Sequence, residues 1–387
     1  MNATPELLRE LATREPGDQG TLSVYVRTDP RDPANTADVP AWVVALRNGL
    51  REVGRRLEEE GSRAERLAVR ELAGRVEAEL LELHAAERAR GVAWFLTPDG
   101  ALDRRISLQI APRADVVRWD ALPFVSPLVD VADRGRATGF VLVAGERVRL
   151  LHWEGGQVRE PQRSLYELKL GEWREYAAYA MANPARAQQT ATHAASFEQR
   201  VEDWRGRFLR DAAEAVASRV TELGWRRLVV AAEGQVATRF ADALPDRTRE
   251  LVAARVGVNL LWEEPPAVAD RLEKPLGDAW RDDLLARVAR ALDAARPNGP
   301  GAAGLGPVLE ALVQFRVEWL VLDPLHRFDR AGLSSAAADA VGGASAELLG
   351  ERAVELAVAG GAEVSALTAA DSASLARAGG IAATLRY

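Results

Sequence analysis

Apolar residues recur every three or four positions between Phe197 and Leu223, which is the period of one buried face of an α-helix. Ser196 followed by Gln199 is typical of a helix start, and Gly224 stands where many helices end. The pattern therefore predicts a helix about 40 Å long at 1.5 Å per residue. Trp204 has the spacing of this apolar stripe and is predicted to pack in a core.

Strand-like segments lie on both sides of the long helix in the sequence. An antiparallel meander is predicted before it, from Phe140–Ala144, Val148–Trp153 and Val158 onward, with turns at Gly145-Glu146 and Gly155-Gly156. The segments predicted after it are the strand Leu228–Ala232, a short helix around Ala237–Ala243 and the strand Val256–Trp262. The stretch from Glu172 to Ala195 lacks sustained periodicity and is predicted to be a loop or short helices.

Prolines and glycines mark the boundaries of the predicted domains. Asp120–Pro127 holds two prolines, and Pro265-Pro266 interrupts the periodicity again. The predicted fold class is α/β, in a three-domain chain. The predicted domains are an N-terminal α/β domain over 1–133, a central domain with a mixed sheet and the long helix over 134–264, and a C-terminal α/β/α sandwich over 265–387.

Composition excludes several kinds of chemistry. The chain has no cysteine, and its four histidines lack the spacing of a metal site or a catalytic pair, so no metal and no cofactor are expected. The only lysines, Lys169 and Lys274, are followed by Leu and Pro, which excludes the phosphate loop of nucleotide hydrolases. No signal peptide and no apolar run of membrane-spanning length are found, so a cytoplasmic location and no membrane partner are predicted.

Three glycines, Gly299, Gly301 and Gly304, have the spacing of a dinucleotide-binding fingerprint. That fingerprint must follow a strand, whereas a helix from about Ala269 to Arg296 is predicted here. The stretch Asn298–Gly306 is therefore interpreted as a linker.

The net charge of -7 argues against indiscriminate coating of nucleic acid, although a local basic face is compatible with it. All basic residues except the two lysines are arginine, which suits bidentate phosphate contacts and stacking on bases. A GC-rich genome that favours arginine codons explains the same composition equally well.

Two segments carry a resemblance to a known family. GGAEVSALTAADSASLARAGGIAATLRY, from Gly360 to Tyr387, resembles the end of the third domain of archaeal and eukaryotic release factors and of Pelota rescue factors, and Pro307–Asp323 resembles the helix and strand that open that domain. The meander GFVLVAGERVRLLHWEGGQ and the helix with RFLRDAAEAV are similar to the central domain of the bacterial members, which include Balon-type hibernation factors and rescue-type release factors.

The resemblance implies a translation factor that binds the ribosomal A site, with rRNA and possibly tRNA as its contacts. It further implies a C-terminal domain that docks a translational GTPase such as elongation factor Tu. Because the chain lacks a phosphate loop, that GTPase must be a separate protein.

Release factors of this family hydrolyse peptidyl-tRNA with a Gly-Gly-Gln loop just before the long helix. The chain has Gly155-Gly156-Gln157, but between two strands of the meander, where a hairpin turn explains the glycines. The stretch that corresponds to the catalytic loop lies near Met181–Ser196, and no glycine occurs from Glu172 through Arg205. No catalytic residue is therefore predicted firmly. Gln188 and Gln189 are the candidates, with solvated loop residues as the alternative.

Arginines cluster around the start of the long helix. Arg186, Arg200, Arg205 and Arg207 are the candidates for RNA binding, and a solvated helix face with intrahelical pairs is the alternative. The preferred interpretation is a hibernation or rescue factor without efficient peptide release. A peptidyl-tRNA hydrolase with a divergent glutamine loop is the second, and a family member recruited to a non-ribosomal interaction is the third.

Overall fold

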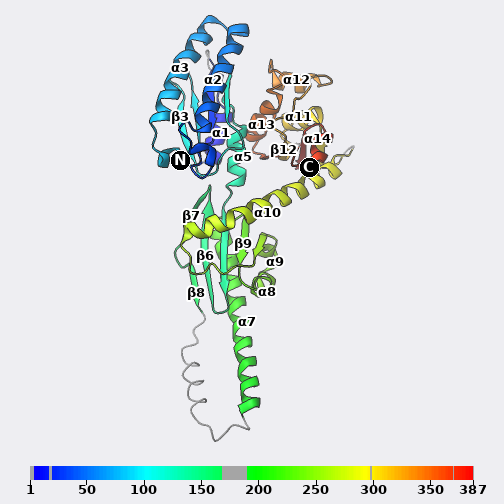
Figure 1. The fold of residues 1–387 in the computed structure, drawn as a ribbon. Helices are drawn as coiled ribbons and strands as arrows, with labels where there is room; N and C mark the ends of the chain where they lie inside the picture. The colour runs from blue at the N-terminus through cyan, green and yellow to red at the C-terminus, as the bar shows by residue number, and fades with distance from the viewer. Residues whose placement is uncertain (1–3, 17–19, 168–189, 297–298, 369, 387) are drawn as a thin grey trace. The chain divides into compact units, whose positions relative to one another are not determined.

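The computed structural model describes residues 4–16, 20–167, 190–296, 299–368 and 370–386 (Figure 1). Their strands form three sheets, and the chain divides into two compact units. We call Met1–Gly135 together with Asp282–Tyr387 the discontinuous unit, and Arg136–Arg281 the central unit. Helices and strands alternate in both units, which confirms the predicted α/β class, whereas the division into three domains stays a prediction.

The first sheet of the discontinuous unit is antiparallel and has the order β3-β2-β1-β4. Its strands are β1 (Thr21–Val26), β2 (Gly91–Leu96), β3 (Asp103–Leu108) and β4 (Val116–Asp120). The helices of this part are α1 (Pro5–Ala12), the 3₁₀ helix η1 (Pro33–Asn35), α2 (Ala41–Glu60), α3 (Arg63–Glu82), α4 (Ala85–Arg88) and α5 (Ser126–Arg134).

Helices α2 and α3 form a hairpin that packs on this sheet (Figure 1). Leu46 of α2 and Val76 of α3 are buried in one core with Val24 and Trp94 of the strands. Ser62 begins α3 with a capping box, because its hydroxyl accepts from the Glu65 amide and the Glu65 carboxylate accepts from the Ser62 amide. The hairpin thus presents one face to the sheet and leaves the opposite face for solvent.

The second sheet of the discontinuous unit has the order β11-β14-β12-β13. Its strands are β11 (Gly301–Ala303), β12 (Val317–Leu322), β13 (Glu363–Ala366) and β14 (Ile381–Leu385), of which β12 and β13 run parallel. Its helices are α11 (Leu305–Val313), α12 (Ser335–Val341), α13 (Leu349–Ala359) and α14 (Ala373–Arg377). Helix α10 (Pro265–Ala294) begins in the central unit and ends in the discontinuous unit.

The glycines before α11 allow close backbone packing. A Cβ at Gly299 would lie 2.2 Å from the Ala294 carbonyl oxygen, and a Cβ at Gly301 would lie 2.7 Å from that of Ala291. Because α10 is a helix and directly precedes them, the requirement of a preceding strand for the dinucleotide fingerprint is not met, as predicted. The interpretation of this stretch as a plain linker is wrong in one respect, since it contains β11.

The central unit is built on one mixed sheet with the order β10-β9-β5-β6-β7, to which β8 adds beside β6. Its strands are β5 (Thr138–Ala144), β6 (Arg147–Glu154), β7 (Gln157–Arg159), β8 (Leu165–Glu167), β9 (Arg227–Ala231) and β10 (Val252–Val256). Its helices include α7 (Thr190–Glu222), α8 (Val236–Ala243) and α9 (Asp246–Arg249). The antiparallel meander and the mixed sheet are confirmed, since β5, β6 and β7 pair antiparallel while β9 runs parallel to β5.

Two predicted boundaries in the central unit are wrong. The last strand is Val252–Val256 rather than Val256–Trp262. Helix α7 begins at Thr190, before Ser196, because the Ala-rich residues that precede Ser196 favour helix continuation more than a cap. Its end is as predicted, since the helix stops at Glu222 and Gly224 has a φ of 63°.

Candidate RNA-binding surface of the central unit

The C-terminal half of α7 packs on the sheet. Phe208, Ala212 and Val216 are buried in one core with Val141 and Val230 of the strands. The strands β5 and β6 span only about 25 Å, whereas a helix of 33 residues spans about 50 Å. The sheet is therefore too short to cover the whole helix.

Trp204 lies one turn before Phe208, and 39% of its surface is exposed. The prediction that Trp204 packs in the core is therefore wrong. Its spacing continues the apolar stripe, but among the α7 residues whose burial is described, from Asp203 onward, the first buried one is Phe208. Helical period alone does not report how far a partner sheet extends along a helix.

The four predicted arginines differ in their surroundings. Arg186 lies outside the described residues, and Arg200 lies within α7. Arg205 is half-buried, and its Nη2 lies 3.5 Å from the Glu146 carboxylate in the turn between β5 and β6. Arg207 is exposed, and within the described part of the chain it has no ion pair, so its guanidinium is the one best placed to meet a phosphate.

The Gly-Gly-Gln motif is a hairpin turn, as predicted. Gly155 and Gly156 join β6 to β7 with φ angles of 57° and 83°, which side chains rarely adopt, and Glu154 pairs with Gln157 across the turn. Gln157 itself is exposed. The two glycines are therefore explained by the turn alone, and the two other candidates, Gln188 and Gln189, lie outside the described residues.

His152 is the one buried histidine among the described residues of this unit, and its contacts are structural. The Trp225 indole N–H donates to His152 Nδ1 at 2.9 Å, while His152 Nε2 lies 3.3 Å from the Glu154 carboxylate. Burial lowers the pKa of His152, so the neutral ring with its proton on Nε2 fits both neighbours. Across the described parts of the chain no group of three or more metal-binding side chains occurs.

An exposed tryptophan was missed by the sequence analysis. Trp262 is 68% exposed, and the Arg147 guanidinium lies over its ring at 4.6 Å. Arg147 also pairs with Glu167 at 2.9 Å. The sequence predicted Trp262 within a strand, so nothing in its spacing indicated an exposed aromatic platform suited to stacking on a base.

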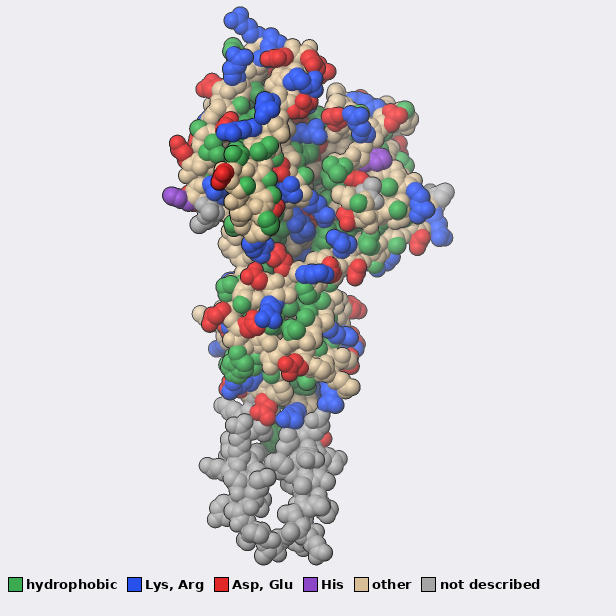
Figure 2. All heavy atoms as spheres, viewed as in Figure 1, with side chains coloured by type: hydrophobic (Ala, Val, Ile, Leu, Met, Phe, Trp, Pro, Cys, Tyr) green, Lys and Arg blue, Asp and Glu red, His purple; other side chains and the backbone are tan. Residues whose placement is uncertain are grey.

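The visible face of the protein carries basic and acidic side chains interspersed over both units (Figure 2). This mixture of charges agrees with the net charge of -7. It favours recognition of RNA by a few individual arginines over binding to a continuous basic surface. None of the described helices is both long and apolar enough to cross a membrane.

The chain is similar to the release factors of archaea and eukaryotes. Residues 123–293, which include the whole central unit, match the model of the Bacterial archaeo-eukaryotic release factor family 10. The match confirms the resemblance predicted from the sequence. The curated proteins include no match to the chain.

Three of the solved structures that are similar to the chain are a translation termination factor and two Pelota proteins. The archaeal translation termination factor aRF1 is 19% identical over 99% of this chain and 96% of its own, with a TM-score of 0.25. Pelota of Archaeoglobus fulgidus is 16% identical over 77% and 79%, with a TM-score of 0.33. A ribosome-bound archaeal Pelota is 13% identical over 100% and 95%, with a TM-score of 0.41.

Proposed function

We propose that the protein is a translation factor of the archaeo-eukaryotic release-factor type that occupies the ribosomal A site without efficient peptide release. The match of residues 123–293 to a bacterial release-factor family is the observation that carries this proposal. The exposed Arg207 on α7 and the exposed Trp262 supply the kinds of side chain that meet phosphates and unstacked bases. A protein that occupies the A site in this way is suited to the hibernation or rescue of ribosomes.

The position of the Gly-Gly-Gln motif favours occupation of the A site over hydrolysis of peptidyl-tRNA. Gly155 and Gly156 are committed to a two-residue turn between β6 and β7, and the segment from Glu172 through Arg205 has no glycine. Hydrolysis of an ester requires a positioned water and donor, which in release factors depends on glycine backbone conformations. A peptidyl-tRNA hydrolase that uses Gln188 or Gln189 is the alternative, and it is an outcome of the test below.

The partners proposed are ribosomal RNA, possibly tRNA, and a separate translational GTPase such as elongation factor Tu. Deletion of Pro307–Tyr387 would be a poor test of GTPase binding, because it would also remove Glu351 of α13, which accepts hydrogen bonds from the start of α5. Affinity capture of the full chain from growing and starved cells avoids this problem. Recovery of ribosomal subunits together with a translational GTPase is the expected result.

Two measurements on purified components test the proposal. The full chain should sediment with 70S ribosomes and should release little peptide from peptidyl-tRNA in the P site. If the chain does not sediment with ribosomes, the proposal is wrong. Release well above background that disappears in Gln188→Ala or Gln189→Ala would replace it with the hydrolase function.

A further inference from the structure

The discontinuous unit consists of two segments of the chain, and we call the contacts between its N-terminal and C-terminal segments the junction. The N-terminal segment contributes Asp120, at the end of β4, and Ser126, at the start of α5. The C-terminal segment contributes Glu351, Arg352 and Glu355, all from α13. Glu351 and Glu355 are only 3% and 7% exposed. The junction therefore contains ionisable groups that water hardly reaches.

Hydrogen bonds and ion pairs cross the junction. Glu351 accepts from the Ser126 amide at 3.2 Å and also from the Ser126 hydroxyl. Arg352 Nη2 donates to the Asp120 carboxylate at 2.7 Å, and Arg352 Nη1 donates to Glu355 at 2.7 Å. Helix α13 thus binds two separate points of the N-terminal segment, the end of β4 and the start of α5.

The charges at the centre of the junction do not balance. Three carboxylates, those of Asp120, Glu351 and Glu355, interact with the guanidinium of Arg352. If all three were ionised, two negative charges would be left without a cation in a place that is poorly solvated, which is costly. Burial accordingly raises the pKa of Glu351 to about 7 and that of Glu355 to about 8, and the charge of Glu351 contributes to the second shift.

The other charged groups around α13 do not compensate this excess. Those on the helices and strands that pack against α13 are exposed or are paired with another residue. They are Glu6, Arg9 and Glu10 of α1, Glu310 of α11, Glu318 of β12, Asp339 of α12 and Glu363 of β13.

The titratable groups on the N-terminal side do not compensate it either. On α5, Asp130 already pairs with two arginines, at 2.9 Å and 2.8 Å, and Asp133 lies seven positions after Ser126, about 10 Å further along the helix. On β1, burial and the charge of Glu351 raise the pKa of Tyr25, so that its ring stays neutral. The protons that reduce the excess charge must therefore be bound by the carboxylates themselves.

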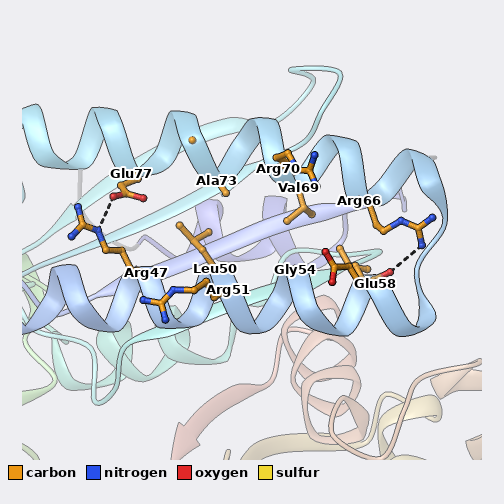
Figure 3. Close-up of a pocket in the computed structure, with 12 residues that line it drawn as sticks. Arg47, Leu50, Arg51, Gly54, Glu58, Arg66, Val69, Arg70, Ala73 and Glu77 are labelled. Carbon is orange, nitrogen blue, oxygen red and sulfur yellow. Dashed lines mark hydrogen bonds and ion pairs between the residues drawn. The ribbon is translucent and has the colours of Figure 1, made fainter.

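A groove of about 380 Å³ between α2 and α3 provides the contrast (Figure 3). It is also lined by arginines and glutamates, and Arg47 Nε lies 2.7 Å from the Glu77 carboxylate. These two side chains are 43% and 35% exposed, so water solvates both charges. The carboxylates of the junction differ in being buried together with a single guanidinium.

We propose that bound protons hold the two segments of the discontinuous unit together, so that the junction opens more readily as the pH rises through neutrality. A protonated Glu351 still accepts from the Ser126 amide, since a carboxyl group keeps acceptor capacity. Loss of the protons leaves Asp120, Glu351 and Glu355 ionised beside Arg352, and separation of the segments lets water solvate these charges. Because the closed junction binds more protons than the open one, a rise in pH must favour opening. The proposal does not depend on ribosome binding.

Hydrogen exchange on the full chain tests the proposal. The protection factor, which is the intrinsic exchange rate divided by the observed rate, removes the direct effect of pH on exchange chemistry. For the amides of Val125 and Ser126, which donate to Glu351, it should fall at least about tenfold from pH 6 to pH 8.5. The amides of β1, in the core of the same segment, should keep their protection.

Glu355→Gln and Glu347→Gln form a matched pair of variants. Glu355→Gln cannot ionise, so the change in protection between the two pH values should be at least about fivefold smaller than in the wild type. Glu347 also crosses the junction, to Arg118 at 3.4 Å, but it is 44% exposed and the hydrogen bond from Arg327 lowers its pKa. Glu347→Gln should therefore keep the pH dependence of the wild type.

Three results would overturn the proposal. The first is a protection factor at Val125 and Ser126 that is constant or rises with pH. The second is an equal loss of protection in β1, which would mean that the whole unit unfolds and that the junction does not open by itself. The third is a pH dependence that Glu347→Gln reduces as much as Glu355→Gln does. Should Glu355→Gln lower the melting temperature at pH 6, the wild-type comparison of the junction with β1 decides the question.

Discussion

Glu351 accepts a hydrogen bond at 3.2 Å from the backbone amide of Ser126, although 225 positions separate the two residues in the sequence. The Val125 amide and the Ser126 hydroxyl also donate to the Glu351 carboxylate. Helix α5 has no side-chain cap of its own, and its first backbone N–H groups have no acceptor within the helix. A carboxylate from α13 therefore caps α5 within the discontinuous unit.

The first prediction concerns this cap. Glu351→Ala should lower the free energy of unfolding by about 2 to 3 kcal/mol, because it leaves buried donors at Val125 and Ser126 without an acceptor. Urea denaturation of the full chain measures the change. Glu347→Ala is the control, since Glu347 is partly exposed and its pair with Arg327 at 2.6 Å should contribute less than about 1 kcal/mol. Equal losses in the two variants would contradict the capping role.

The second prediction concerns pH. Burial raises the pKa of Glu351 to about 7, and burial together with the charge of Glu351 raises the pKa of Glu355 to about 8 despite the contact with Arg352. A carboxyl whose pKa is higher in the folded state binds a proton on folding. The free energy of unfolding should therefore fall as the pH rises from about 4.5 to about 8. The expected fall is on the order of 2 kcal/mol.

Melting temperatures measured between pH 5 and pH 9 test whether stability falls as the pH rises. Glu355→Gln, which keeps the size of the side chain and cannot ionise, should flatten the decline. Carboxylates with a lowered pKa affect stability in a different pH range. The hydrogen bond from the Ser62 amide lowers the pKa of Glu65, whose contribution to stability is lost only in acid. A wild-type melting temperature that increases from pH 5 to pH 8 would show that Glu351 and Glu355 are ionised in the folded protein.

The third prediction concerns the Gly-Gly-Gln hairpin. Gly156→Ala should destabilise the central unit by about 1 kcal/mol, because the residue at this position has a positive φ. Gln157→Ala should change stability by less than about 0.5 kcal/mol and should leave ribosome binding intact. Thermal denaturation and co-sedimentation measure the two effects. Loss of a releasing activity through Gln157→Ala alone would place catalysis in this turn after all.

The fourth prediction concerns RNA contact through α7. The logarithm of the affinity for 70S ribosomes should fall linearly with the logarithm of the salt concentration, since arginines that bind phosphates release counterions. Arg207→Gln should weaken binding and reduce the slope by about 1. Arg205→Gln should have the smaller effect, because Glu146 already partners Arg205. An affinity that does not respond to salt would exclude arginine-phosphate recognition.

The sequence predicted well those elements whose apolar pattern is complete within a short window. The strand predicted at Val148–Trp153 is observed at Arg147–Glu154, and the turn at Gly155-Gly156 is at its predicted place, because it needs two positive φ angles. The exposed Trp204 was not predictable, since its environment depends on the length of a sheet formed by distant strands. The short edge strands β8 and β11 were missed because three residues are too few to show a period.

In the candidate site, too, local features were predictable from the sequence and long-range ones were not. Hairpin glycines carry a local signal, so the structural role of Gly155-Gly156 was predictable from the sequence. The exposure of Trp262 was not predictable, because it depends on where the last strand of the central sheet ends.

The cap of α5 by Glu351 also sets an order of events during synthesis. Ser126 leaves the ribosome 225 residues before Glu351 does, which is roughly 10 to 45 s at 5–20 residues per second. Throughout that interval α5 lacks this cap, while the whole central unit is being translated. Maturation of the first-made part of this protein therefore waits for one of its last-made helices, and a chain that terminates early keeps that helix start open to chaperones and proteases.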